Sequence, residues 1–120
     1  MEYKFINTEY LDSVSGNDID IIREIVNMFK EQVNEIYNEM CSHLSEKNYL
    51  ALGLLAHKAK SSVAIMGMND LGLMLKTFEL QAKEGKGSDL YESYIKRFKT
   101  ETEIATTELE DFVNNRVNNK

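Results

Sequence analysis

Apolar residues recur at steps of three and four along residues 19–44, and polar residues fill the gaps between them. This spacing places the apolar side chains along one face of a helix. The pattern predicts one long amphipathic helix that starts near Asn17 or Asp18 and stops near residues 46–48. Asn17 is the expected N-cap, because its short polar side chain can accept from free backbone N–H groups.

The same periodicity predicts a short leading helix and three further long helices. Their expected ranges are about Thr8 to Val14, Asn48 to Met66, Leu71 to Ala82 with Asn69 or Asp70 as its cap, and Leu90 to Val113. Gly16, Gly67 and the Gly85–Ser88 stretch separate these segments, and glycine readily adopts the left-handed conformation that ends a helix. The last helix is expected to fray into the polar tail 114–120.

No segment alternates between apolar and polar residues over a convincing length, so a sheet is not expected. Short connections make sequential helices antiparallel neighbours. The predicted fold is therefore all-α, an up-down-up-down antiparallel four-helix bundle with a short N-terminal helix. Residues 1–120 are interpreted as a single domain, because no linker, repeat or low-complexity tract divides them.

Composition narrows the choice of partners and compartment. The chain has 120 residues, no proline, 42% hydrophobic residues and a formal net charge of −6. An acidic chain has no global positive field to recruit phosphates, so neither nucleic acid nor an anionic membrane is expected as the main partner. The lone Cys41 cannot form an internal disulfide, and no apolar stretch has the length of a signal peptide or a membrane span. We expect a soluble, cytoplasmic protein.

One face of the predicted helix at residues 48–66 does not fit a plain bundle. At about 100° per residue, one side gathers the core positions Leu52, Leu55, Ala59, Ser62, Val63 and Met66. The opposite stripe consists of Leu50, Gly53, Leu54, His57, Lys60, Ser61 and Ala64. Leucines on a solvent face and a glycine in mid-helix are both unfavourable choices for a helix exposed only to water. We interpret this stripe as a docking surface.

His57 is the candidate for chemistry on that surface. Gly53 lies one turn before it and Ser61 one turn after it, so a partner could approach the imidazole closely. Lys58 and Lys60 add a local positive field that disfavours imidazolium, keeps a ring nitrogen nucleophilic and can neutralise an anion on that nitrogen. The alternative at this point is an exposed helical histidine without a role.

The residues around His57 resemble a known family. His57-Lys-Ala-Lys60-Ser61-Ser62-Val-Ala-Ile-Met-Gly67, with Leu71 and Phe78-Glu79 one helix later, is similar to the signature of histidine-containing phosphotransfer (HPt) domains. That signature has a lysine three residues after the histidine, a small residue next, and a glycine ten residues after the histidine. The resemblance extends from about Tyr10 to Lys83. Ser61 departs from it, since the family usually has glycine there.

The resemblance implies a phosphorelay intermediate. His57 would take a phosphoryl group from an aspartyl phosphate on one receiver domain and pass it to another, with Lys60 stabilising the phosphoryl oxygens. Glu79 would accept from Nδ1–H of the histidine, beside the basic Lys83. The implied partners are response-regulator receiver domains and a sensor or hybrid histidine kinase. No cofactor and no autonomous catalysis are expected in this chain, because the receiver would supply Mg²⁺.

Three alternatives accompany this interpretation. A helical adaptor of the same fold could bind a partner through Leu50, Leu54 and Ala64 without receiving phosphate. Glu79 and Lys83 could be an ordinary surface ion pair at i and i+4. No metal is expected, because the spacing of the cysteine and the two histidines matches no metal motif. Met68, near the end of the histidine helix, is a further candidate for the docking rim.

Overall fold

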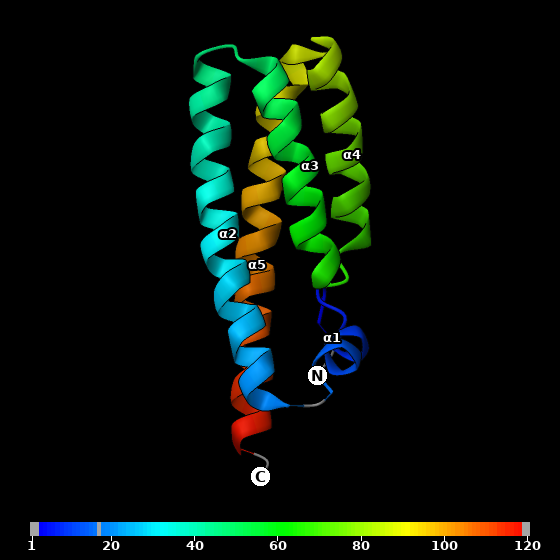
Figure 1. The fold of residues 1–120 in the computed structure, drawn as a ribbon, viewed down its shortest axis with the longest axis vertical. Helices are drawn as coiled ribbons and strands as arrows, with labels where there is room; N and C mark the ends of the chain where they lie inside the picture. Colours follow the sequence, from blue (N-terminus) through cyan, green and yellow to red (C-terminus); the bar gives the residue numbers. More distant parts are fainter. Residues whose placement is uncertain (1–2, 17, 119–120) are drawn as a thin grey trace.

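The computed structural model describes residues 3–16 and 18–118, and within them the chain forms five α-helices and no β-strand. The helices are α1 (Thr8–Ser15), α2 (Ile19–Ser45), α3 (Tyr49–Ile65), α4 (Asn69–Glu84) and α5 (Tyr91–Asn118), with a single 3-10 turn, η1 (Ser88–Leu90), before α5 (Figure 1). The all-α class predicted from the hydrophobic periodicity is confirmed.

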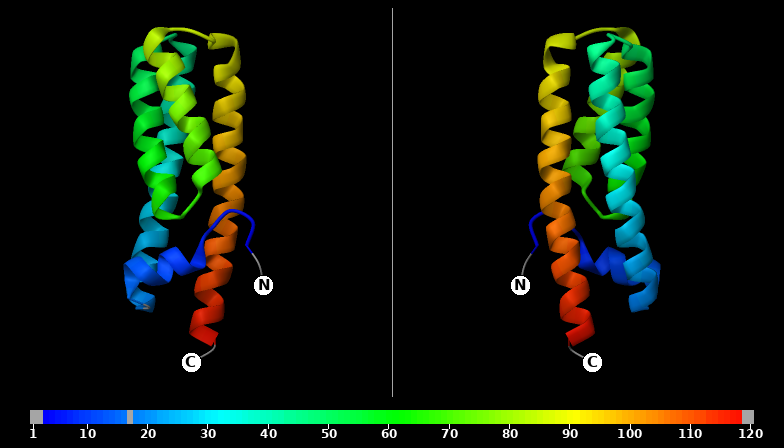
Figure 2. Two further views of the ribbon diagram at one scale, coloured as in Figure 1. Left: turned by 90° about the vertical axis from the view of Figure 1, so that its right-hand side faces the viewer. Right: turned by 90° about the vertical axis from the view of Figure 1, so that its left-hand side faces the viewer.

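α2, α3, α4 and α5 form an antiparallel bundle in which each helix reverses the direction of the previous one (Figures 1 and 2). α3 and α4 form the closest pair, and α5 closes the bundle against α2 and α4. The up-down-up-down arrangement is therefore the predicted one. α2 and α5 have 27 and 28 residues, whereas α3 and α4 have 17 and 16. The two longer helices extend past the α3–α4 turn, and α1 lies beside this extension (Figure 2).

A side-chain cap begins α3, and the predicted glycine ends it. The Asn48 side chain caps the helix by accepting from the backbone N–H of Ala51 at 3.3 Å. Gly67 adopts a left-handed backbone with φ of 74°, which turns the chain toward α4. A Cβ atom at Gly67 would lie 2.5 Å from Cβ of Asn7, so this turn requires glycine for space as well as for its backbone angle.

The caps of two other helices differ from the expectation. Asp18 caps α2 by accepting from the backbone N–H of Asp20 at 2.9 Å, and Asn17 lies outside the described residues. The prediction of Asn69 or Asp70 as the cap of α4 was wrong, because α4 already begins at Asn69 and Met68 precedes it without a side-chain cap. Met68 takes this position because its side chain is buried, and that burial outweighs a polar cap.

The boundaries of α5 also differ. The helix starts at Tyr91 rather than Leu90, because residues 88–90 form the 3-10 turn. It runs to Asn118, so the prediction that residues 114–120 fray was wrong for the described part of that tail. Residues 114–118 contain neither glycine nor proline, and Asn115 donates to Asp111 Oδ2 one turn earlier at 3.2 Å.

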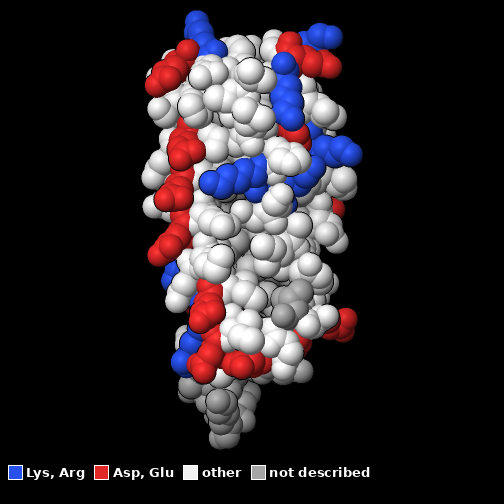
Figure 3. Space-filling model, viewed as in Figure 1, with Lys and Arg blue, Asp and Glu red and all other residues white. Residues whose placement is uncertain are grey.

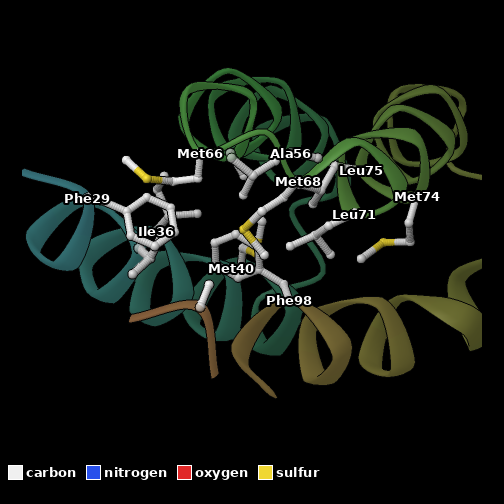
Figure 4. Packing of buried hydrophobic residues seen from close by; sticks show 14 of the residues in the cluster. Phe29, Ile36, Met40, Ala56, Met66, Met68, Leu71, Met74, Leu75 and Phe98 are labelled. Atoms are coloured by element: carbon white, nitrogen blue, oxygen red, sulfur yellow. The ribbon is translucent and has the colours of Figure 1, made fainter. Parts of the chain in front are cut away.

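The core fills the space between the four long helices. Methionines from three elements meet there with leucine and phenylalanine, as the close view shows (Figure 4). The largest fully buried side chains are Leu11, Ile22, Ile36, Met40, Leu52, Met66, Leu71, Leu75, Phe78, Tyr91, Phe98 and Leu109. α3 thus contributes one face to the core and leaves the opposite face for a partner or for solvent.

The segment before α1 is fixed to α5. The Glu108 carboxylate accepts from the backbone N–H groups of Lys4, Phe5 and Ile6 at 2.6, 2.9 and 3.2 Å. Farther along, the backbone N–H of Asn7 donates to the carbonyl of Met66 at 3.0 Å. Residues 4–7 are therefore tied both to α5 and to the turn that follows α3.

Candidate functional site

α3 separates its apolar and functional faces as the sequence predicted. The core side of the helix, Leu52, Leu55, Ala59, Ser62, Val63 and Met66, is buried. His57 projects from the other side, and 58% of its side chain is exposed. A reacting group on another protein can therefore reach the imidazole without any rearrangement of the bundle.

The imidazole of His57 contacts a carboxylate from the neighbouring helix. Nδ1 of His57 lies 3.1 Å from Oε2 of Glu79 on α4. A carboxylate next to one ring nitrogen accepts a hydrogen bond from the N–H of that nitrogen, and this bond fixes which nitrogen carries the proton. With Nδ1 facing Glu79, Nε2 is the ring nitrogen on the side away from α4. The contact expected between Nδ1 and Glu79 is present.

Glu79 is a buried anion held by lysines. Only 9% of its side chain is exposed, and Lys83 Nζ lies 2.7 Å from Oε2 while Lys60 Nζ lies 3.8 Å from Oε1. The hydrogen bond from Lys83 holds the pKa of Glu79 below its ordinary value of 4.5, burial opposes this, and the hydrogen bond with His57 adds to the lowering. The i and i+4 ion pair weighed as an alternative is present between Glu79 and Lys83, but its carboxylate is buried rather than at the surface.

The other polar candidates lie around this pair. Lys60 is one-third exposed and reaches toward Glu79, whereas Lys58 is fully on the exposed side of α3. The Ser61 hydroxyl is exposed, and its Oγ lies 3.5 Å from the carbonyl of His57, at the limit of a hydrogen bond. Lys60 is thus the lysine of α3 that shares the carboxylate with the histidine.

Figure 3 shows how charge is distributed over this face. Basic side chains gather over the middle of α3 and α4, largely uncharged surface surrounds them, and acidic side chains follow the outer edge of α2. Leu50 and Leu54 are 60% and 56% exposed, and Ala64 is also exposed.

Ile65 is 44% exposed and was missed in the sequence analysis. Ile65 follows Leu54 by eleven residues and so lies only about 20° from Leu54 around the helix. The spacing could therefore have revealed Ile65 as part of the same face.

Two residues assigned to the docking surface lie elsewhere. Gly53 is buried against α4, where a Cβ atom would lie 2.9 Å from Lys83 Cγ and 3.1 Å from the carbonyl oxygen of Glu79. Met68 is 3% exposed and points into the core near Leu71 (Figure 4). Neither residue is at the surface. Gly53 was placed by helical angle, which does not reveal how closely a neighbouring helix approaches, and Met68 only by its nearness to the end of the histidine helix.

Residues 3–16 and 18–118 contain neither a metal cluster nor a membrane-spanning helix. No group of three or more His, Cys, Asp or Glu side chains is arranged to hold a metal ion in that part of the chain. No helix within it is long and apolar enough to cross a membrane.

The fold and the site define a helical bundle that carries an exposed histidine paired with a buried carboxylate. The model of the Hpt domain family matches residues 24–115, which is most of the chain and includes the histidine. The chain therefore belongs to the Hpt domain family. Hpt domains are the phosphocarrier modules of histidine phosphotransfer in phosphorelays, and they work with two-component receiver and kinase partners. Comparisons with curated proteins and with solved structures found no match.

Proposed function

We propose that His57 is the phosphoryl acceptor of this Hpt domain, accepting the group from the aspartyl phosphate of one receiver domain and passing it to a second receiver. The observation that carries the proposal is the 3.1 Å contact between Nδ1 of exposed His57 and the buried Glu79 carboxylate. A neutral imidazole whose proton is donated to Glu79 keeps its lone pair on Nε2, the atom directed away from α4.

The transfer step uses that lone pair. Nε2 attacks the phosphorus atom, an N–P bond forms, the P–O bond to the receiver aspartate breaks, and the electron pair stays on the aspartate carboxylate. The ring keeps its Nδ1 proton and gains positive charge as the bond forms. Glu79 balances this charge from 3.1 Å, in a partly buried setting where electrostatic interactions are stronger than in water.

The basic residues have separate roles in the proposal. Lys60 Nζ lies 3.8 Å from Oε1 of Glu79, beyond hydrogen-bond distance. Glu79 therefore holds the Lys60 ammonium only weakly, and the ammonium is free to neutralise phosphoryl oxygens on Nε2. Lys83, at 2.7 Å, keeps Glu79 ionised and in place. Lys58 and Ser61 contribute less, Lys58 through its charge and Ser61 through its hydroxyl. The receiver domain supplies Mg²⁺ and most of the charged groups, so the Hpt domain acts as a carrier without catalysis of its own.

Docking of the receiver is assigned to the exposed apolar positions around the histidine. Leu50, Leu54 and Ala64, together with Ile65, supply an apolar surface on α3 beside His57. Apolar contact area next to a reactive group is typical of a partner interface, because its burial holds two proteins together while the group reacts.

The proposal is tested by mixing the chain with a panel of receiver domains that carry radiolabelled aspartyl phosphate. Transfer should give a label on this chain that is labile in acid and stable in base, as expected of a phosphoramidate on histidine. A second, unlabelled receiver should then remove the label. Receiver binding without any labelling would instead favour the helical adaptor, and the absence of both binding and labelling would overturn the proposal.

A further inference from the structure

The close approach of α3 and α4 at Gly53 has a consequence for His57. Gly53 lies in the middle of α3, one turn before the histidine, and is buried against α4. Glycine inside a helix is less favourable than alanine, because it loses more backbone freedom on folding. The helix tolerates this less favourable residue only if the contacts around it exclude a larger one.

The contacts supply the reason. A Cβ atom at Gly53 would lie 2.9 Å from Lys83 Cγ, 3.1 Å from the backbone N of Lys83 and 3.1 Å from the carbonyl oxygen of Glu79. Lysine could move its flexible side chain, but two of the three atoms belong to the backbone of α4. A side chain at residue 53 would therefore push that turn of α4 away from α3.

The turn that would move is the one that carries the carboxylate. Glu79 and Lys83 bracket the contact with Gly53, and Glu79 Oε2 lies 3.1 Å from Nδ1 of His57. That distance is already near the long end of the range for N–H···O hydrogen bonds. A displacement of a few tenths of an ångström would weaken the bond between the carboxylate and the imidazole.

We propose that Gly53 is a positioning residue for phosphotransfer: it lets α4 approach α3 closely enough for Glu79 to hold the Nδ1 proton of His57. Gly53 touches neither the imidazole nor the phosphoryl group and acts only through the separation of the two helices. The inference rests on the proposed function of His57, but the hydrogen bond it concerns can be measured without any phosphate.

The test compares two glycines at the same pair of helices. Gly53→Ala introduces the contacts described above. Gly72→Ala is the matched control, because the nearest atom to a Cβ at Gly72 is Val63 Cγ2 at 4.0 Å, an ordinary van der Waals distance. Nitrogen-15 spectra of the imidazole, recorded at a pH where the ring signals show it to be neutral, report the fraction of His57 that carries its proton on Nδ1.

We expect the Nδ1–H form to dominate in the unmodified protein and in Gly72→Ala, and to fall in Gly53→Ala. The rate constant for transfer from a phosphorylated receiver should fall roughly fivefold in Gly53→Ala alone, with receiver affinity unchanged. The inference is overturned if Gly53→Ala keeps the normal ring spectrum and rate, or if both alanine variants change equally.

A second variant covers the case in which Gly53→Ala does not fold. Glu79→Asp shortens the side chain by one methylene and withdraws the carboxylate from Nδ1 without any new contact at Gly53. It should lower the Nδ1–H fraction and the transfer rate in the same direction, and an unchanged spectrum would overturn the inference. If no receiver labels the unmodified chain, the proposed function fails, whereas the ring spectra still decide the role of Gly53.

Discussion

Nδ1 of His57 on α3 lies 3.1 Å from Oε2 of Glu79 on α4, across 22 positions of sequence. The two side chains differ in exposure, 58% for the histidine and 9% for the glutamate. The contact therefore joins an imidazole on the surface to an anion held inside the bundle. Several measurable properties of the protein depend on this pairing.

Replacing His57 with glutamine should abolish labelling by phosphorylated receivers. Glutamine can still donate to Glu79, and the site is exposed, so the free energy of unfolding should change by less than about 0.5 kcal/mol. Labelling and urea denaturation measure the two effects. His43→Gln, which replaces the other of the two histidines, is the control and should label normally. Labelling that persists in His57→Gln would show that another residue is the acceptor.

Leu54→Glu should weaken receiver binding at least tenfold, about 1.4 kcal/mol, because it puts a charge into the apolar surface proposed for docking. The fold should persist, since 56% of Leu54 is exposed. Titration calorimetry with a receiver domain measures the affinity. Ile104→Glu on α5 is the matched control, an exposed apolar residue on a different helix, and should bind normally. Equal affinity for both variants would contradict the assigned surface.

Lys60→Ala should slow transfer from a receiver roughly tenfold to a hundredfold, because a cation near the phosphoryl oxygens is lost. Stability should change by less than about 0.5 kcal/mol, since a partly exposed ion pair contributes little. Lys58→Ala, which alters the exposed side of the same helix, should have the smaller effect on rate. Time courses of both variants decide the assignment, which fails if only Lys58→Ala is slow.

The lowered pKa of Glu79 predicts a specific pH dependence of stability. Its pKa is depressed below 4.5 in the folded protein, mainly by the Lys83 hydrogen bond, so the unfolded chain binds its proton first as the pH falls. The stabilising contribution is therefore full above about pH 5 and is lost as the pH falls through the folded pKa. Urea unfolding at a series of pH values should show a steeper acid loss for the unmodified protein than for Glu79→Gln. Parallel curves would contradict the pairing.

Glu108→Gln should destabilise the protein by about 1–2 kcal/mol, because the carboxylate accepts from three backbone N–H groups and charged acceptors bind more strongly than neutral ones. Amide exchange at residues 4–6 should accelerate at the same time. Glu110→Gln removes a surface pair with Lys30 and should change stability by less than about 0.5 kcal/mol. Unchanged exchange at residues 4–6 in Glu108→Gln would contradict the role of that carboxylate.

Periodicity was sufficient to predict the fold. The three- and four-residue spacing of apolar positions predicted every long helix, and Gly67 and Gly85 predicted two of the turns, because glycine accepts the left-handed backbone found there. The cap of α4 was not predictable in this way. Met68 stands at the cap position because its side chain packs into the core. Preferences for cap residues reflect local hydrogen bonding and take no account of burial in the core.

Part of the candidate site was also readable from the sequence. The angle per residue correctly put His57, Leu50 and Leu54 on the exposed face of α3. It could not show that Gly53 contacts α4 or that Glu79 is buried, because both depend on the distance between two helices. That distance is set by packing, which a single helix pattern does not encode.

The site lies on α3 and α4, in the part of the molecule where four long helices pack together. Beyond the α3–α4 turn, α2 and α5 are accompanied by α1 and the segment held by Glu108 (Figure 2). Regions with less packed neighbouring structure open at a lower free energy than a full core. Partial unfolding is therefore expected to begin at this end, and the four-helix part that carries His57 and Glu79 is expected to open later. A phosphoryl group on the histidine would then keep its surroundings through most fluctuations of the domain.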